Sequence, residues 1–328
     1  MDLRFAICDF GFAILDFDFL LLTPPSPLLP MCGIIGLLIK QPPLRDRLGE
    51  LTVPMLIGMS ERGPDSAGLA VFTETLANPY RKYSLYSGGK AFDWQELGQV
   101  LQTQFETTPH LQNHGNQAVL TTDLPSATLK PWLQEHYPQL HILSTGRAID
   151  LYKDAGNPTD VADRYQFANL KGSHVVAHTR MATESAVTPA HAHPFTAGED
   201  FCLVHNGSLS NPNEIRRKLE PRGIHFETDN DTEAACRFLE WRMREGDDLT
   251  TALQKGFEAL DGFYTFLMGT VDKLALVRDA FACKPAVVAE TDEYVAIASE
   301  FRSLAHLPNV NHAHIYEPAP EEIYIWNV

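Results

Sequence analysis

The chain has 328 residues, of which 44% are hydrophobic, and its formal net charge is −16. This length and apolar content suffice for one large core or two small ones. The excess of acidic residues argues against general affinity for nucleic acid or for anionic membranes, but it is compatible with a basic partner protein. The five cysteines are scattered and form no CxxC pair, which is typical of a reducing compartment, so we expect a cytoplasmic protein.

The first 30 residues do not read as the start of a folded domain. They hold four aspartates and one arginine, and four prolines lie between positions 24 and 30. The aspartates argue against a secretory signal, and the prolines break any membrane-spanning helix over the uncharged stretch 19–39. Two interpretations stay open, a propeptide removed before Cys32 and an over-extended start with translation beginning at Met31. In both, residues 1–31 are a leader absent from the mature protein.

Apolar runs, turn residues and helix-start signals predict the elements of the first half of the chain. We expect a strand at Cys32–Lys40, a helix at Leu44–Ser60 disturbed at Pro54, and strands at Ala67–Thr73 and Tyr83–Tyr86. Residues 88–173 are an elaboration, with helices at Trp94–Gln102, Ser126–Glu135 and Pro158–Gln166 and strands at Ala118–Thr121 and His141–Ser144. Its packing is left open: a lobe over the functional site, a docking surface, or an enlargement of the core.

The second half alternates between apolar strands and amphipathic helices. We expect helices at Asn211–Leu219, with Asn211 as the cap, at Asp231–Arg244 and at Leu249–Leu260. The expected strands are His174–Thr179, Phe201–His205, Tyr264–Val271, Leu274–Arg278, Ala286–Ala289, Tyr294–Ala298 and Glu322–Trp326. Strands and helices in two blocks predict an α+β protein with stacked sheets flanked by helices.

Cys32 is the candidate nucleophile, because it follows Met31 at the start of an apolar, strand-like run. If the chain began at Cys32, one residue would carry both a thiol and a free α-amine. An α-amine titrates at about 7.7–8.0 and an ordinary thiol at about 8.5, so the amine could accept the thiol proton near neutral pH. Nucleophile and general base would then share one residue.

Several polar motifs follow strands or open a helix further along the chain. Each is a weak signal alone, since an Asn-Gly pair after a strand is usually a turn. The motifs are Glu61-Arg62-Gly63-Pro64-Asp65-Ser66-Ala67-Gly68, His178-Thr179-Arg180-Met181-Ala182-Thr183-Glu184, His193-Pro194-Phe195, Val204-His205-Asn206-Gly207 and Thr228-Asp229-Asn230-Asp231-Thr232-Glu233. In this order behind Cys32, they resemble the class II glutamine amidotransferase domain, whose members begin with a nucleophilic cysteine. The resemblance covers residues 32–328, with 73–173 matching only loosely.

Two details resemble the glutamate-synthase branch, and most closely its stand-alone amidotransferase subunits that partner separate synthase-type chains. They are the amino-acid sequence of residues 178–185 and the run Ala298-Ser299-Glu300. The glucosamine-phosphate synthase branch usually has tryptophan where Met181 stands, and His-Gly where this chain has Glu184-Ser185.

The resemblance implies a four-layer αββα sandwich of the N-terminal-nucleophile hydrolase type and a glutamine-hydrolysing activity. Cys32 would attack the side-chain amide of glutamine, giving an oxyanion, then a glutamyl thioester and ammonia. The side-chain amide of Asn206 and the backbone N–H of Gly207 would stabilise the oxyanion.

The remaining predicted site residues would recognise the amino-acid head of glutamine or support the site. Arg180 would hold the α-carboxylate through its planar guanidinium, and Asp231 would receive the α-ammonium. Thr183 and His193 would line the pocket. Two further residues, Arg62 and Asp65, are interpreted as a structural pair near the nucleophile, with direct substrate contact as the alternative.

A zinc site is the competing interpretation of the histidines, since His191 and His193 have ligand-like spacing. The sequence offers these histidines no well-placed carboxylate or cysteine, so we expect no metal. It also contains no Walker A or dinucleotide-binding fingerprint.

The resemblance leaves the ammonia acceptor undefined. Because the chain ends at Val328 without room for a fused synthase domain, we expect a separate glutamate-synthase-type subunit as the partner. A flavin (FMN) or an iron–sulfur cluster would belong to that partner, and this chain would hold no cofactor. Two other functions stay open, a free-standing N-terminal-nucleophile amidohydrolase acting on another amide and a non-catalytic regulatory subunit.

Overall fold

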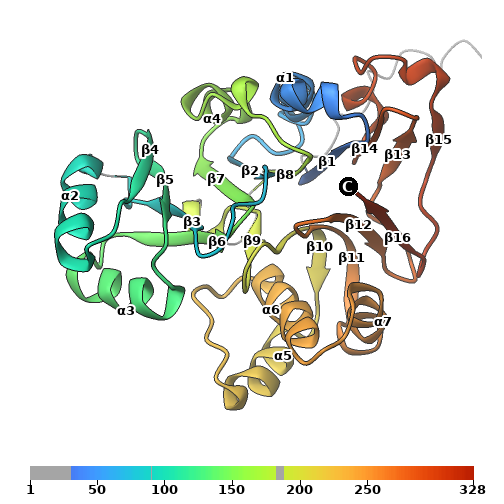
Figure 1. The fold of residues 1–328 in the computed structure, drawn as a ribbon. Helices are drawn as coiled ribbons and strands as arrows, with labels where there is room; N and C mark the ends of the chain where they lie inside the picture. Colours follow the sequence, from blue (N-terminus) through green and yellow to red (C-terminus); the bar gives the residue numbers. More distant parts are fainter. Residues whose placement is uncertain (1–30, 90, 182–187) are drawn as a thin grey trace, which may run out of the picture.

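The computed structural model describes residues 31–89, 91–181 and 188–328, and its centre is a pair of antiparallel β-sheets packed face to face (Figure 1). Within these residues the first sheet has seven strands, in the order β15 (His314–Tyr316), β13 (Val287–Glu290), β14 (Tyr294–Ala298), β1 (Gly33–Ile39), β8 (His174–Arg180), β2 (Ser66–Phe72) and β7 (Ile149–Ala155). The second has five, in the order β16 (Ile323–Asn327), β12 (Lys273–Arg278), β11 (Gly262–Gly269), β10 (Cys202–Leu209) and β9 (Phe195–Thr196). An apolar layer that includes Ile34, Leu38, Val204 and Leu267 fills the space between them.

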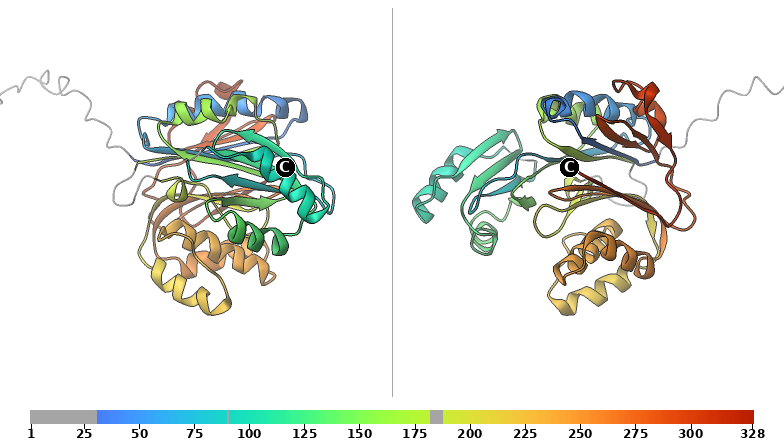
Figure 2. Two further views of the ribbon diagram at one scale, coloured as in Figure 1. Left: turned by 90° about the vertical axis from the view of Figure 1, so that its left-hand side faces the viewer. Right: turned by 45° about the vertical axis from the view of Figure 1, so that its right-hand side comes forward.

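Helices cover the outer faces of both sheets (Figure 2). The seven-stranded sheet is covered by α1 (Leu48–Gly58) and α4 (Pro158–Arg164), and the five-stranded sheet by α5 (Pro212–Leu219), α6 (Asp231–Arg244) and α7 (Leu249–Ala259). The layers therefore run helix, sheet, sheet, helix, which confirms the predicted four-layer αββα sandwich. Among the described residues, no helix is long and apolar enough to cross a membrane.

A separate lobe stands beside these layers, on the left of Figure 1. It is a four-stranded sheet in the order β4 (His110–His114), β5 (Gln117–Thr122), β3 (Arg81–Tyr86) and β6 (His141–Gly146), covered by α2 (Trp94–Phe105) and α3 (Ser126–His136). The lobe contacts β7 through β3. The N–H of Leu151 donates to Ser84 Oγ at 2.8 Å, and Lys82 forms an ion pair with Asp150 at 3.0 Å. Although β7 and α4 fall within the predicted elaboration 88–173, they belong to the main layers.

The predicted helix at Leu44–Ser60 is two elements in the structure. A 3₁₀-helix spans Pro42–Arg47, and α1 then runs from Leu48 to Gly58 with Pro54 inside it. The prediction placed the helix start too early, because the two adjacent prolines at positions 42 and 43 open a tighter turn. The strands β4, β7, β9 and β15 were not predicted.

The strand that follows Cys32 lies in the middle of the seven-stranded sheet. Each of the seven residues of β1 is buried, and the strand is hydrogen-bonded to β14 on one side and to β8 on the other. Ladder bonds on both sides and a fully apolar sequence fix this strand in the core. The residue at its start is therefore held in a defined place.

Candidate active site

Cys32 directly precedes β1, and two side chains hold its backbone. Its carbonyl oxygen accepts hydrogen bonds from Arg62 Nε at 3.2 Å and from Asn206 Nδ2 at 3.1 Å. The thiol sulfur lies 3.9 Å from the carbonyl oxygen of Met181. The backbone of Cys32 is thus fixed by Arg62 from the turn after α1 and by Asn206 from β10, while its side chain faces a pocket.

Burial and the nearby positive charges shift the pKa of the Cys32 thiol in opposite directions. Burial raises the pKa of the Cys32 thiol above its ordinary value, because the low-dielectric surroundings disfavour a thiolate. The positive charges of Arg180, Lys284 and Arg62 lower the pKa, and burial prevails. A thiol in this setting needs a nearby base to accept its proton before it can act as a nucleophile.

The pocket beside the thiol has a volume of about 880 Å³. It is bounded by the start of β1, the end of β8, the middle of β10 and the start of α6. Its lining residues are Met31, Cys32, Arg180, Met181, His191, His193, His205, Asn206, Gly207, Ser208, Leu209, Asp229, Asn230, Asp231, Thr232, Phe263 and Lys284. Six of the predicted site residues therefore meet here: Cys32, Arg180, His193, Asn206, Gly207 and Asp231. Thr183 lies outside the described residues.

Arg62 and Asp65 lie in the turn after α1 and contact the site from behind. The guanidinium of Arg62 pairs with Glu300 at 2.5 Å while its Nε holds the Cys32 carbonyl. The backbone N–H of Asp65 donates to the carbonyl oxygen of Arg180 at 3.0 Å. Both residues support the backbone next to the thiol, and the ion-pair partner found for Arg62 is Glu300.

Asn206 and Gly207 lie on β10, opposite Thr265 and Tyr264 of β11. A primary amide carries two N–H groups, and Asn206 uses one on the Cys32 carbonyl; the other makes no hydrogen bond with the described residues. Gly207 has φ +147°, and a Cβ there would lie 2.1 Å from the carbonyl oxygen of Phe263. This position therefore requires glycine, both for its backbone angle and for the close approach of β11.

Asp231 is the first residue of α6, and its Oδ2 accepts a hydrogen bond from Leu209 N–H at 2.9 Å. Its Oδ1 lies 3.7 Å from His205 Nδ1. Burial alone would raise the pKa of this carboxyl, but the neighbouring His205 and the backbone N–H donors outweigh it and lower the pKa to about 2. Asp231 is therefore ionised at neutral pH and offers a negative charge at the pocket wall.

Three buried histidines form a cluster with Thr232 beside the pocket. Thr232 Oγ1 lies 2.8 Å from His193 Nε2 and 3.1 Å from His205 Nδ1, and the rings of His178 and His193 stack with centres 4.2 Å apart. Burial lowers the pKa of His178 to about 3 and that of His193 well below its ordinary value, so both rings are neutral. Sequence reasoning did not assign His178, His205 or Thr232 to the site, although all three lie inside the motifs it singled out.

The proposed zinc alternative concerned the histidines of the same region. His191 Nε2 lies 3.0 Å from Asp229 Oδ1, and its Nδ1 lies 2.7 Å from Thr188 Oγ1. In the part of the chain that the structure describes, no three His, Cys, Asp or Glu side chains are grouped so that they could hold a metal ion.

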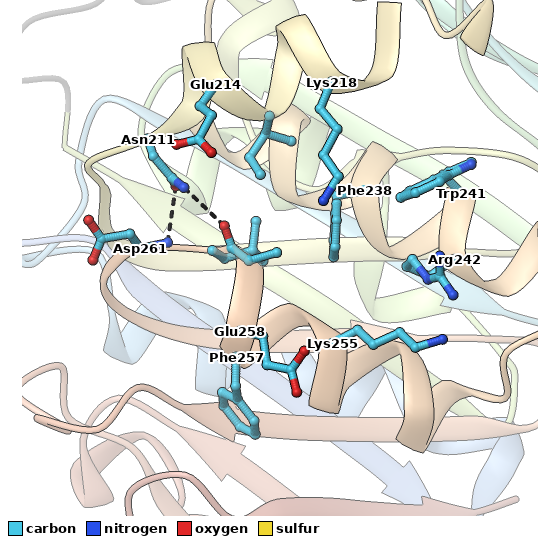
Figure 3. Close-up of a pocket in the computed structure, with 13 residues that line it drawn as sticks. Asn211, Glu214, Lys218, Phe238, Trp241, Arg242, Lys255, Phe257, Glu258 and Asp261 are labelled. Atoms are coloured by element: carbon cyan, nitrogen blue, oxygen red, sulfur yellow. Dashed lines mark hydrogen bonds between the residues drawn. The ribbon is translucent and has the colours of Figure 1, made fainter.

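A second pocket, of about 740 Å³, lies among α5, α6 and α7 on the outer side of the molecule (Figure 3). It shares no lining residue with the Cys32 pocket, and its described lining has no Cys, Ser, Thr or His. Figure 3 also shows that Asn211 bonds the Ala259 carbonyl and the Asp261 N–H, at 2.9 and 3.0 Å. Asn211 therefore occupies the N-cap position of α5 as predicted, but its side chain makes no capping hydrogen bond, because this amide joins α5 to the end of α7 instead.

Known proteins similar to this chain agree with the geometry of the site. The family model described as a glutamine amidotransferase domain matches residues 178–306. The chain is 44% identical over 297 residues to the glutamine amidotransferase-like protein GlxB of Rhizobium meliloti, covering 90% of this chain and 98% of that protein. It is 31% identical over 305 residues to a putative glutamine amidotransferase of Methanothermobacter thermautotrophicus, covering 90% and 99%.

The solved structure of the glutamine phosphoribosylpyrophosphate amidotransferase of B. subtilis shares the fold, with a TM-score of 0.57 at 18% identity over 90% of this chain and 47% of that one. The fold, the pocket and the relatives together define an N-terminal-nucleophile type of amidotransferase. The chain belongs to the class II glutamine amidotransferase family. It is an enzyme of the class that hydrolyses glutamine and donates the ammonia.

Proposed function

We propose that this chain is the glutaminase subunit of a two-protein system, with Cys32 as its nucleophile and a separate glutamate-synthase-type subunit as the receiver of the ammonia. One observation carries the proposal. The Cys32 thiol lies at the start of a central strand and shares its pocket with a guanidinium, a carboxylate and a side-chain amide, those of Arg180, Asp231 and Asn206. These are the groups that an amide-hydrolysing, amino-acid-specific site requires.

The reaction begins when the α-amine of a first-residue Cys32 accepts the thiol proton. The sulfur then attacks the side-chain carbonyl carbon of glutamine, and the carbonyl electron pair moves onto oxygen. The free N–H of Asn206 and the backbone N–H of Gly207 stabilise this oxyanion. When it collapses, the proton held by the α-amine passes to the leaving nitrogen and ammonia departs. Water then hydrolyses the glutamyl thioester and releases glutamate.

Arg180 and Asp231 would recognise the amino-acid head of glutamine. A guanidinium binds a carboxylate through two parallel hydrogen bonds, and an ionised carboxylate suits an ammonium group. Asp231 is ionised at neutral pH, as its low pKa indicates. His193 lines the same pocket, and Thr183 is proposed to do so.

The proposal of a partner rests on the chemistry of ammonia. The pocket opens to solvent, since the side chain of Asp229 at its wall is 85% exposed. Ammonia released into water near neutral pH becomes ammonium, which is not a nucleophile. A synthase subunit that covers the opening would keep the ammonia unprotonated until it reacts, and the flavin or iron–sulfur cluster of the synthesis step would reside there. We place both subunits in the cytoplasm.

The decisive experiment is intact mass and N-terminal sequencing of the cell-made protein, followed by a glutaminase assay. We expect Cys32 as the first residue, ammonia release from glutamine, and loss of that release in Cys32→Ala with the fold retained. Cys283→Ala is the matched control, because Cys283 is exposed and does not line the pocket. Ammonia release by a chain that still carries residues 1–31 would overturn the proposed mechanism.

Two further measurements separate this function from its alternatives. A panel of amides distinguishes a glutaminase from a general amidohydrolase, since the latter would be indifferent to the α-carboxylate. Affinity purification of the chain from its native cells should recover a flavin or iron–sulfur protein that makes its product from glutamine only when the chain is present. If the chain were recovered alone and released its ammonia into solution, the proposal of a partner subunit would be contradicted.

A further inference from the structure

Lys284 is a cation of the Cys32 pocket that the proposed reaction does not use. It lies in the loop after β12, is half-buried and lines the same pocket as the thiol. Its Nζ lies 5.3 Å from the centre of the Phe263 ring. It forms no ion pair with any residue that the structure describes, so no carboxylate of this part of the chain neutralises its charge.

The loop that carries Lys284 is held on both sides. The carboxylate of Asp279 accepts hydrogen bonds from the N–H groups of Tyr264 and Phe281, both at 2.7 Å. The hydroxyl of Thr265 donates to the carbonyl oxygen of Lys284 itself at 2.8 Å. The backbone of Lys284 is therefore fixed against β11, and its side chain starts from a defined point.

This anchoring places Lys284 on one particular wall of the pocket. Thr265, which holds the Lys284 carbonyl, lies directly opposite Asn206 in the β10–β11 ladder. Phe263, which lies under the Lys284 ammonium, makes the close backbone approach to Gly207. Lys284 thus adjoins the wall that carries Asn206 and Gly207, whereas Arg180 comes from β8 of the other sheet.

We propose that Lys284 is an electrostatic positioning residue of the glutaminase reaction, whose ammonium stabilises the negative charge that moves from the Cys32 sulfur to the carbonyl oxygen of the substrate. This inference rests on the proposed function. Its physical basis is that a cation in a half-buried pocket acts on a developing charge more strongly than it would in water. In agreement, the charge of Lys284 lowers the pKa of the Cys32 thiol.

Lys284 gives up no proton in this scheme. The thiol proton goes to the Cys32 α-amine and later to the leaving nitrogen, the S–C bond forms, and the C–N bond breaks. Lys284 stays an ammonium throughout and acts through its charge. The other charged or titratable groups around the thiol are Arg180, Arg62, Asp229, Asp231, His191, His193 and His205, and the variants below leave all of them unchanged.

The test compares Lys284→Met and Lys284→Arg in the full protein as isolated, in a Cys283→Ser background that removes an exposed thiol. The rate of Cys32 alkylation by iodoacetamide is followed from pH 6 to 10 by peptide mass spectrometry. For Lys284→Met we expect the midpoint to rise by about 0.5–1 pH unit and the rate at pH 7 to fall about three- to tenfold. In the glutaminase assay kcat falls by a similar factor with KM nearly unchanged, and Lys284→Arg restores both readouts.

Lys218→Met is the control for the loss of one positive charge, because Lys218 lines the separate pocket of Figure 3. It should leave both readouts at wild-type values. An unmoved alkylation midpoint in Lys284→Met overturns the inference, and so does a rise confined to KM, which would make Lys284 a substrate-binding residue. If the protein hydrolyses no glutamine, the proposed function fails, yet the alkylation midpoint still reports whether Lys284 acts on the sulfur.

Discussion

Arg62 donates a hydrogen bond from Nε to the carbonyl oxygen of Cys32 at 3.2 Å, and thereby connects the candidate nucleophile to an ion pair whose arginine is buried. The partner of that pair is Glu300, whose carboxylate lies 2.5 Å from Arg62 Nη1. Glu300 follows β14, the strand beside β1, so the contact closes a ring around the start of β1. The position of Cys32 therefore depends on a carboxylate 268 positions further along the chain.

We expect Glu300→Gln to destabilise the protein by about 3 kcal/mol, because it leaves the buried Arg62 guanidinium without its counter-charge. We also expect kcat to fall about tenfold, since the Cys32 backbone loses its support. Urea unfolding and the glutaminase assay measure the two effects. The control is Glu61→Gln, because Glu61 pairs with Arg302 at 2.8 Å but is 76% exposed, and its loss should cost at most about 1 kcal/mol. Equal costs for the two variants would contradict this view of the Arg62–Glu300 pair.

Gly207→Ala should cost about 2–4 kcal/mol of stability, because the new methyl group would meet the Phe263 carbonyl and the backbone angle is unfavourable for alanine. The displaced β10 would also move the proposed oxyanion donors and abolish measurable ammonia release. Gly223→Ala is the matched control, since Gly223 also has a positive φ (+77°) but nothing within 4 Å of a Cβ. Its cost should stay near 1 kcal/mol. If the Gly207→Ala protein were as stable as the Gly223→Ala protein, the backbone of β11 could move away from the new methyl group at little cost.

Thr232→Val removes the hydroxyl that two buried imidazoles share. His193 Nε2 and His205 Nδ1 would lose a partner in a place where water does not replace it, so we expect a loss of about 2–3 kcal/mol in the free energy of unfolding. The Thr232→Ser variant keeps the oxygen and should retain most of the stability. Both are measured by urea unfolding at pH 7. If Thr232→Val left the free energy of unfolding unchanged, the two imidazoles would have other hydrogen-bond partners.

The stability of the protein should fall as the pH drops from 6.5 towards 3. Burial lowers the pKa of His174 to about 3, so the unfolded chain binds a proton at this residue below about 6.5 while the native chain does not. The stabilisation is complete above pH 6.5 and is lost on acidification, by an amount on the order of 3–5 kcal/mol for this residue. Unfolding free energies from pH 4 to 8 measure the slope.

His174→Phe keeps a ring that can stack on Phe72, whose ring centre lies 4.2 Å from that of His174, but removes the titrating group. It should reduce the slope between pH 6.5 and 4 by the contribution of His174, whatever its effect on absolute stability, and leave the contributions of His178 and His193, whose pKa values burial also lowers. His110→Gln, a change at an exposed histidine, should leave the slope unchanged. A His174→Phe protein with the wild-type slope would show that His174 does not contribute to the pH dependence.

Elements with a local signal were predictable from the sequence. The helix Asp231–Arg244 has the predicted bounds because Asn230 caps it, accepting a hydrogen bond from Thr232 N–H at 2.8 Å, and because its apolar face is periodic. In contrast, β7 contains Asp150, Lys153 and Asp154, all of which are buried. Three charged residues in a short segment indicate an exposed segment rather than a buried strand. In the structure the lobe provides Lys82 as the ion-pair partner of Asp150, so only the tertiary structure identifies β7 as a strand.

The residues of the candidate site also divide into those with a local sequence signal and those that only the tertiary structure identifies. Residues inside a sequence motif, such as Asn206 and Asp231, could be assigned to the pocket before the structure was known. Lys284 lies in no such motif, and its place in the pocket depends on the pairing of β11 with β10 and on the loop after β12. Likewise, no sequence pattern links Arg62 to Glu300, because the contact requires β14 to lie beside β1.

Met31 lines the same pocket as Cys32, and this has a consequence for how activity begins. While the bond between the two residues is intact, the nitrogen of Cys32 is an amide without basicity, and the methionine occupies part of the pocket proposed to receive glutamine. Cutting that single bond removes both obstacles together. An uncut precursor would thus be fully silent, and the onset of activity would follow one proteolytic event without intermediate stages.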